Sequence, residues 1–244
     1  MTQSNTVTEK ERHMFLTCEK YYIFELLICA AGMMGAYTFN LRGGVFCNAQ
    51  TANVVLMAIA FGKGQIANGL YYLIPITAYI AGAAISEVLP LRVRKIHFLR
   101  WDTYLVGFEI MVLCIIGFIP LSAPVQIVQV LINFICSMQY NTFRQAEGIP
   151  MSTTFVTNHI RQIGIWLSKA TEKKVPGAWR RVWSHLRMVG VFFLGGLFLT
   201  ISCPFLREKA IWLALCPLLI SFVIMGHADR SFELTQLEQK PHGH

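Results

Sequence analysis

Residues 21–39 read YYIFELLICAAGMMGAYTF, an apolar block with a single acid that is long enough to cross a bilayer. A helix of about 20 residues spans roughly 30 Å of hydrocarbon. Because lipid offers the backbone no hydrogen-bond partner, a block of this kind must be helical. Five more such blocks follow along the chain: Gly69–Leu89, Thr103–Ile119, Val125–Gln139, Val189–Cys203 and Ala210–Met225. The sequence therefore predicts an all-α integral membrane protein.

The composition agrees with this prediction. Of the 244 residues, 55% are hydrophobic and 14% are charged, whereas a soluble domain carries about 25% charged residues. We expect the net charge of +8 to hold loops at an anionic membrane surface, and we expect no nucleic-acid partner because no compact basic domain exists. The seven cysteines show no CxxC spacing, and His242 with His244 are too few for a metal site, so no metal or cofactor is expected.

Two further segments, Val45–Phe61 and Met151–Ser168, are predicted to be helical but are more polar. If both cross the membrane, the chain has eight spans, and the basic loops 91–101 and 169–187 lie on opposite sides. If both are re-entrant or broken helices, six spans remain, and both basic loops and both termini lie in the cytoplasm. The positive-inside tendency favours the second arrangement, which we prefer to the eight-span alternative.

A weak internal repeat supports the same arrangement. A shift of 106 residues lays Gly32–Phe61 over Met138–Leu167, and it lays Gly69–Leu89 over a stretch that ends at Gly195. Three crossings per half make the repeat inverted, which is the pattern of many secondary transporters, whereas eight spans would make a parallel 4+4 repeat. This argument is a fold-level analogy. We divide the chain into a polar cytoplasmic segment 1–20, a membrane domain 21–226 with halves 21–121 and 125–226, and a polar cytoplasmic tail 227–244.

The first polar segment carries Gln50, Thr51 and Asn53 shortly after the glycine pair Gly43–Gly44. Residues three apart are neighbours on a helix, so Gln50 and Asn53 are expected to lie side by side. Polar residues in an apolar protein either join helices or line a path for a solute. Both interpretations remain open for this cluster.

The second polar segment carries Thr154, Thr157, Asn158 and Arg161 at spacings of three and four, which predicts one polar helix face ending in a positive charge. An arginine at membrane depth usually faces the interior or a partner. Arg161 therefore either binds an anionic group of a solute, or it reaches the cytoplasmic interface or pairs with Glu147. On the first interpretation, replacing Arg161 with Ala abolishes uptake.

Two acids, Glu25 and Glu109, lie inside apolar blocks. Each either carries a coupling proton or forms an interhelical hydrogen bond. The sequence holds no GxxxxGK phosphate loop, no HExxH and no GxSxG motif. We therefore do not expect an enzyme.

These motifs together resemble the YoaK family of bacterial membrane proteins, long labelled as a domain of unknown function. The resemblance covers roughly Tyr22–Ala228, and it implies a multi-pass protein of the bacterial inner membrane without naming a substrate. The chain departs from the family at Gly35, Ala52 and Asn158, where the family has an acid and two glycines. The matching residues are GGVF at 43–46, QTAN at 50–53, SMQYN at 137–141, Arg144, and TTFVT at 153–157.

The function that we expect is that of a small secondary transporter or permease for a polar solute, anionic if Arg161 binds it. The expected site lies near the midplane, where the two polar segments meet. The alternative is a membrane scaffold or sensor that does not transport and works with a partner protein. The chain is small for enclosing a path alone, which leaves homodimerisation open.

Overall fold

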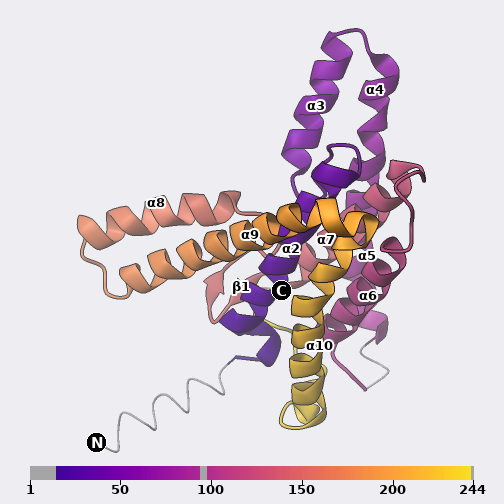
Figure 1. Ribbon diagram of the computed structural model, residues 1–244. Coiled ribbons are helices and arrows are strands. Elements are labelled where there is room, and N and C mark those ends of the chain that lie inside the picture. Colours follow the sequence, from indigo (N-terminus) through magenta and orange to yellow (C-terminus); the bar gives the residue numbers. More distant parts are fainter. Residues whose placement is uncertain (1–14, 94–97, 243–244) are drawn as a thin grey trace, which may run out of the picture.

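The computed structural model describes residues 15–93 and 98–242, which are mostly helical (Figure 1). Most of the predicted N-terminal segment, together with Arg94, Lys95 and His244, lies outside these residues. The first half contains η1 (Thr17–Glu19), α2 (Tyr21–Leu41), α3 (Gln50–Gly62), α4 (Ile66–Tyr71), α5 (Leu73–Val93) and α6 (Trp101–Ile116). The second half contains α7 (Val125–Thr142), β1 (Gln145–Ala146), β2 (Ile149–Pro150), α8 (Thr157–Thr171), α9 (Ala178–Leu206), η3 (Arg207–Ala214), α10 (Leu215–Arg230) and η4 (Leu234–Gln236).

Within the described residues, three helical stretches are long and apolar enough to cross a membrane: Tyr21–Leu41, Ile66–Pro90 and Ala178–Arg230. Large apolar side chains also cover the outside of the bundle. Phe205 is 82% exposed and Val223 is 65% exposed. Apolar exposure on this scale is unfavourable in water and ordinary against lipid. The fold therefore indicates a membrane protein.

The centre of the bundle is made of two pairs of parallel helices. In the first pair, Glu25 of α2 meets Arg187 of α9, and further along both helices Gly32 meets Gly196. A Cβ atom on Gly32 would clash with the carbonyl of Phe192, so the two backbones touch. Small residues permit such close packing. In lipid, where the hydrophobic effect does not drive helices together, van der Waals contacts of this kind stabilise their association.

The second pair consists of α5 and α7, which also run in the same direction. Gly82 of α5 faces Phe134 and Ser137 of α7, and a Cβ atom on Gly82 would clash with both. One turn later, Ser86 accepts a hydrogen bond from Asn141 at 2.9 Å. In both pairs, the first long helix of one half therefore packs against a helix of the other half.

Around these pairs, α10 packs against α6 and α2. The indole of Trp212, just before α10, donates to the Cys114 carbonyl near the end of α6 at 3.1 Å. Asp229 near the end of α10 accepts from the backbone of Arg100, next to the start of α6, at 3.0 Å. The helices α6 and α10 are therefore antiparallel.

Both polar segments begin as irregular chain, which corrects the prediction that they are helical throughout. The helix α3 begins at Gln50 instead of Val45, and α8 begins at Thr157 instead of Met151. Gly43 and Gly44 turn the chain with φ of 85° and 70°, a region that disfavours other L-residues. The irregular residues before α3 and α8 return the chain toward the middle of the bundle, where each helix begins.

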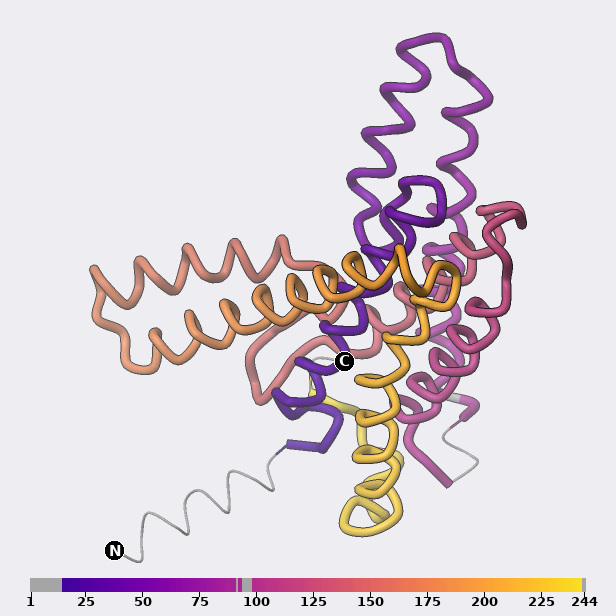
Figure 2. Tube along the Cα trace, viewed as in Figure 1, coloured from indigo at the N-terminus to yellow at the C-terminus, as the bar shows by residue number. Residues whose placement is uncertain are grey.

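Two hairpins extend from the central helices (Figures 1 and 2). The first consists of α3 and α4, and the second consists of α8 and the first part of α9. A short β-hairpin precedes α8, with Gln145 paired to Pro150. Glu147 and Gly148 form its turn with positive φ values of 45° and 76°. This hairpin was absent from the all-α prediction because two-residue strands leave no periodic pattern.

Candidate functional site

The first polar segment folds back toward the middle of the bundle before α3 begins. Residues 46–50, the first tip, lie beside the middle of α2 and α7. Asn48 donates to the Ala31 carbonyl of α2 at 3.3 Å. The sulfur of Cys47 lies 3.7 Å from that of Cys136 on α7. The first tip is therefore held between the two halves of the chain.

The second polar segment forms a comparable second tip, residues 152–157. In both tips, an early side chain of the following helix binds the carbonyl seven residues before it. Asn53 donates to the Phe46 carbonyl at 2.9 Å. The Nε2 atom of His159 lies 2.8 Å from the Ser152 carbonyl. Both donor and acceptor positions differ by 106 residues between the halves, from 53 to 159 and from 46 to 152.

The polar residues of the first tip bind one another. Gln50 donates to the Asn133 side-chain oxygen of α7 at 2.7 Å and accepts from Asn53 at 3.1 Å. Asn53 is fully buried, and its Oδ1 atom has no hydrogen-bond partner among the described residues. The predicted pair of Gln50 and Asn53 is therefore adjacent, and it joins the tip to α7.

A cavity of about 610 Å³ lies beside the contact between α2 and α9, and both tips line it. Its wall is largely apolar, with Asn48 from the first tip and Thr157 from the second among its polar groups. The tips contribute Phe46, Asn48, Ala49, Phe155, Val156 and Thr157. This is the place where the two polar segments meet.

A second cavity of about 540 Å³ lies beside the chain that leads into the second tip. Arg144, Asn158 and Ser152 line it. Arg144 donates to the Asn141 side chain at 2.8 Å and forms an ion pair with Glu87 at 3.2 Å. The second cavity is more polar than the first and contains a guanidinium group.

The structure separates the remaining predicted site residues. Thr51 and Arg161 are exposed, and neither lines the two cavities. Arg161 donates to Asn158 at 3.0 Å, while Glu147 pairs with Arg180 at 3.5 Å. Thr154 lies before α8 and not on its face. Its buried hydroxyl has no hydrogen-bond partner among the described residues.

The two predicted acids differ in their surroundings. Glu25 of α2 forms an ion pair with Arg187 of α9 at 2.6 Å. Glu109 of α6 is fully buried, and neither carboxyl oxygen has a hydrogen-bond partner in the described part of the chain. Glu25 therefore joins two helices, whereas the structure gives Glu109 no such joining contact.

Sequence reasoning did not single out Arg42, which is fully buried. Its guanidinium contacts the Tyr37 hydroxyl at 2.9 Å and donates to the carbonyls of Ile119 and Pro120 at 2.6 and 3.0 Å. These partners lie at the end of the bundle where α2 and α6 end. No local signal identifies such a residue, because two of its partners are backbone atoms far along the chain.

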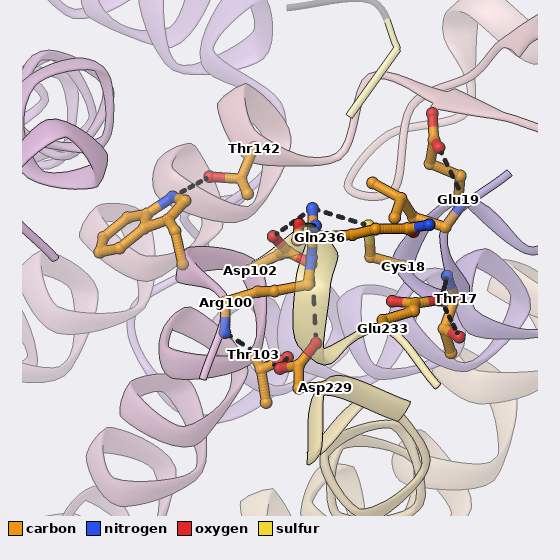
Figure 3. A network of polar contacts seen from close by, with 12 residues as sticks. Thr17, Cys18, Glu19, Arg100, Asp102, Thr103, Thr142, Asp229, Glu233 and Gln236 are labelled. Atoms are coloured by element: carbon orange, nitrogen blue, oxygen red, sulfur yellow. Dashed lines mark hydrogen bonds and ion pairs between the residues drawn. The ribbon is translucent and has the colours of Figure 1, made fainter. Parts of the chain in front are cut away.

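A second buried network occupies the opposite end of the bundle (Figure 3). Arg100 is 2% exposed and donates to both carboxyl oxygens of Asp102 at 3.2 and 3.3 Å. It also donates to the Gln236 carbonyl at 2.8 Å. The Thr103 hydroxyl and the Arg100 backbone both donate to Asp229, at 2.7 and 3.0 Å. The residues around the end of α10 are therefore tied to the start of α6.

The beginning of the described chain joins this network. Thr17 donates its N–H and its hydroxyl to Glu233, both at 2.7 Å. Burial lowers the pKa of the Arg100 guanidinium, but the facing Asp102 outweighs this effect and holds the pKa above its usual value. Burial raises the pKa of the Cys18 thiol, which lies 3.8 Å from the guanidinium. Arg100 therefore stays charged beside a neutral thiol. This charge state is consistent with a structural role for Arg100, which connects the start of α6 to the residues after α10.

These features define a helical membrane protein in which two polar tips meet at one cavity. The chain belongs to the family described as a protein of unknown function, DUF1275, which it matches over residues 23–224. No curated protein matches the chain, and no solved structure matches it.

Proposed function

We propose that this protein is a secondary transporter or permease for a small polar solute, as a YoaK-type member of its family in the bacterial inner membrane. One observation carries the proposal: both tips, which come from different halves of the chain, line the same cavity beside the contact between α2 and α9. Irregular chain at membrane depth is tolerated where it lines a cavity, and transporters place their sites at such interruptions.

The proposal includes six crossings and an inverted repeat. The helices that cross are α2, α4 with α5, α6, α7, α9, and α10 with its preceding turn. The first tip follows the end of α2, where Arg42 contacts Ile119 beyond α6. The second tip follows the end of α7, where Thr142 contacts Trp101 at the start of α6. Because the ends of α6 lie on opposite sides, the tips approach the cavity from opposite sides, as an inverted repeat requires.

An anionic solute fits this arrangement best. The cavity beside the second tip contains Arg144, whose planar guanidinium matches a carboxylate or phosphate. Arg161 and Asn158 lie one helical turn apart on α8, and Asn158 lines this cavity. We propose that the solute enters here and passes between the tips, with Thr157 as its next polar contact.

The test is a thermal-shift screen of the purified protein against common polar metabolites and inorganic anions. A ligand that binds only the native state raises its stability. Ala49→Phe places a ring in the cavity between the tips, and it should cancel the stabilisation by a ligand that binds there. Ala58→Phe makes the same change at an exposed position of α3 and should leave the stabilisation by the ligand intact. Equal stabilisation of both variants would contradict a site between the tips.

A second candidate is a scaffold that does not transport and works with a partner protein. Gln50 and Asn53 favour it, because they bind each other and α7 and so leave few polar groups for a solute. Apolar side chains of α3, such as Val55 and Ile59, are exposed and would face lipid, a second copy or that partner. Copurification of a stoichiometric partner, with no stabilising ligand in the screen, would favour this candidate.

A further inference from the structure

Two buried histidines lie in contact beside the second tip. His159 of α8 and His185 of α9 are both fully buried. Their Nδ1 atoms are 2.9 Å apart, and their ring centres are 5.1 Å apart. Such a distance between two ring nitrogens requires a hydrogen bond, so one Nδ1 carries a hydrogen and the other offers a lone pair.

The surroundings fix which nitrogen carries the hydrogen. The Nε2 atom of His159 lies 2.8 Å from the Ser152 carbonyl, and a carbonyl only accepts. His159 therefore has its hydrogen on Nε2 and, when neutral, a lone pair on Nδ1. His185 must then donate from Nδ1, which leaves its own lone pair on Nε2. That buried Nε2 atom has no hydrogen-bond partner among the described residues.

The first tip has no such pair at the corresponding positions. A shift of 106 residues places Asn53 at the position of His159, and Tyr79 at that of His185. Asn53 makes the same bond to a tip carbonyl, so holding the tip does not require an imidazole. The two histidines therefore offer the second tip something that the first tip lacks, which is a pair of imidazole rings that can take up a proton.

The charged groups around the pair are engaged with other partners. On α9, Arg181 stacks on Trp166 at 4.3 Å, and Arg180 pairs with Glu147 at 3.5 Å. On α2, Glu25 pairs with Arg187, and the buried Tyr21 hydroxyl has no hydrogen-bond partner among the described residues. The exposed Arg161 of α8 binds Asn158. The described contacts of the two rings therefore include no carboxylate.

We propose that His159 and His185 form a single proton-binding site, which takes up one proton at Nε2 of His185. A hydronium ion gives its proton to the lone pair: an N–H bond forms, an O–H bond breaks, and water leaves. His185 becomes an imidazolium, and its hydrogen bond to His159 becomes charge-assisted and stronger. His159 keeps its hydrogen bond to Ser152, so the second tip keeps its conformation while His185 becomes positively charged.

The position of the pair gives the proton a role in transport, and this role rests on the proposed function. Thr157 and Val189, which line the cavity between the tips, lie two residues before His159 and four residues after His185. An imidazolium next to this cavity attracts an anionic solute, and the solute in turn favours proton uptake by the same factor. The coupling proton would then be held by the histidine pair.

Nitrogen-15 NMR of histidine side chains in the purified protein tests the site without any solute. At pH 8 we expect His159 with its hydrogen on Nε2, and His185 with its hydrogen on Nδ1. On stepwise acidification, His185 becomes an imidazolium first, while His159 keeps its neutral signature. The variants H159N and H185Q identify the resonances, because each lacks one set of signals.

The two variants also separate the roles of the rings. The amide introduced by H159N can donate to Ser152, as Asn53 donates to Phe46 in the first tip, and its oxygen can accept from His185, so the titration of His185 should remain. H185Q should abolish the titration of the pair. A wild-type spectrum with the hydrogen of His185 on Nε2, or with two independently titrating rings, would overturn the proposal. Because no solute is present, a failed ligand screen leaves this result unaffected.

Discussion

At the scale of single residues, the structure depends on buried polar groups that local sequence describes unequally. Glu109 stands out in the sequence because it interrupts an apolar block. Arg42 and Arg100 appear as ordinary loop cations, because their burial depends on partners far along the chain. The pairing of Gln50 with Asn53 was predictable from their spacing, whereas the pairing of His159 with His185 depends on how α8 packs against α9.

Glu109 yields a prediction about stability. Its carboxyl group is buried without a hydrogen bond, which costs about 1–3 kcal/mol relative to a satisfied group. Replacing it with Leu should raise the free energy of unfolding by about 1–2 kcal/mol, as measured by denaturant unfolding in micelles. A loss of stability would show that Glu109 has a binding partner in the membrane-embedded protein.

Asp102 provides the contrasting variant for this measurement. It lies within 3.3 Å of the buried Arg100 through both carboxyl oxygens. Replacing Asp102 with Leu leaves that guanidinium without its main counter-charge and should lower the free energy of unfolding by about 3–5 kcal/mol. The opposite signs of the two Leu variants distinguish an unpaired buried acid from a paired one.

At the scale of helices, apolar blocks predicted α2 and α7 well, because these helices face lipid or other helices along their length. The starts of α3 and α8 could not be predicted in the same way. Residues 45–49 and 151–156 are held by tertiary contacts, such as Cys47 with Cys136, and these contacts override local helix propensity. Gly43 and Gly44, and Gly148 with Pro150 in the second half, were the sequence signals that the chain would turn.

The contact between α5 and α7 gives a prediction at this scale. A Cβ atom on Gly82 would clash with the backbone of Phe134, so Gly82→Ala should force the helices apart and cost about 1–3 kcal/mol of stability. Gly190→Ala on α9 is the matched control, because nothing lies within 4 Å of its added Cβ. The control should be neutral or more stable by up to about 1 kcal/mol. Equal thermal shifts for both variants would exclude the tight contact.

At the scale of the whole molecule, the proposed six-span arrangement places the two protruding hairpins on opposite sides of the membrane. Lys63 follows the end of α3, and Lys173 follows α8. A cysteine introduced at Lys63 should react with an impermeant maleimide in intact cells, and one introduced at Lys173 should react only after the cells are opened. Labelling of the parent chain measures the background reaction of the native cysteines. Protection of both positions in intact cells would favour eight spans.

The parallel packing of α2 against α9 also has a consequence for how the protein is made. The last residue of α9, Leu206, leaves the ribosome 165 residues after Leu41 ends α2. At about 5–20 residues per second, roughly 8–33 seconds pass before the glycine face of α2 meets its permanent neighbour. During that interval Glu25 of α2 has no Arg187 to pair with, and lipid, the insertion machinery or another helix occupies the glycine face. The first helix of the protein therefore acquires its final neighbour only after most of the chain has been synthesised.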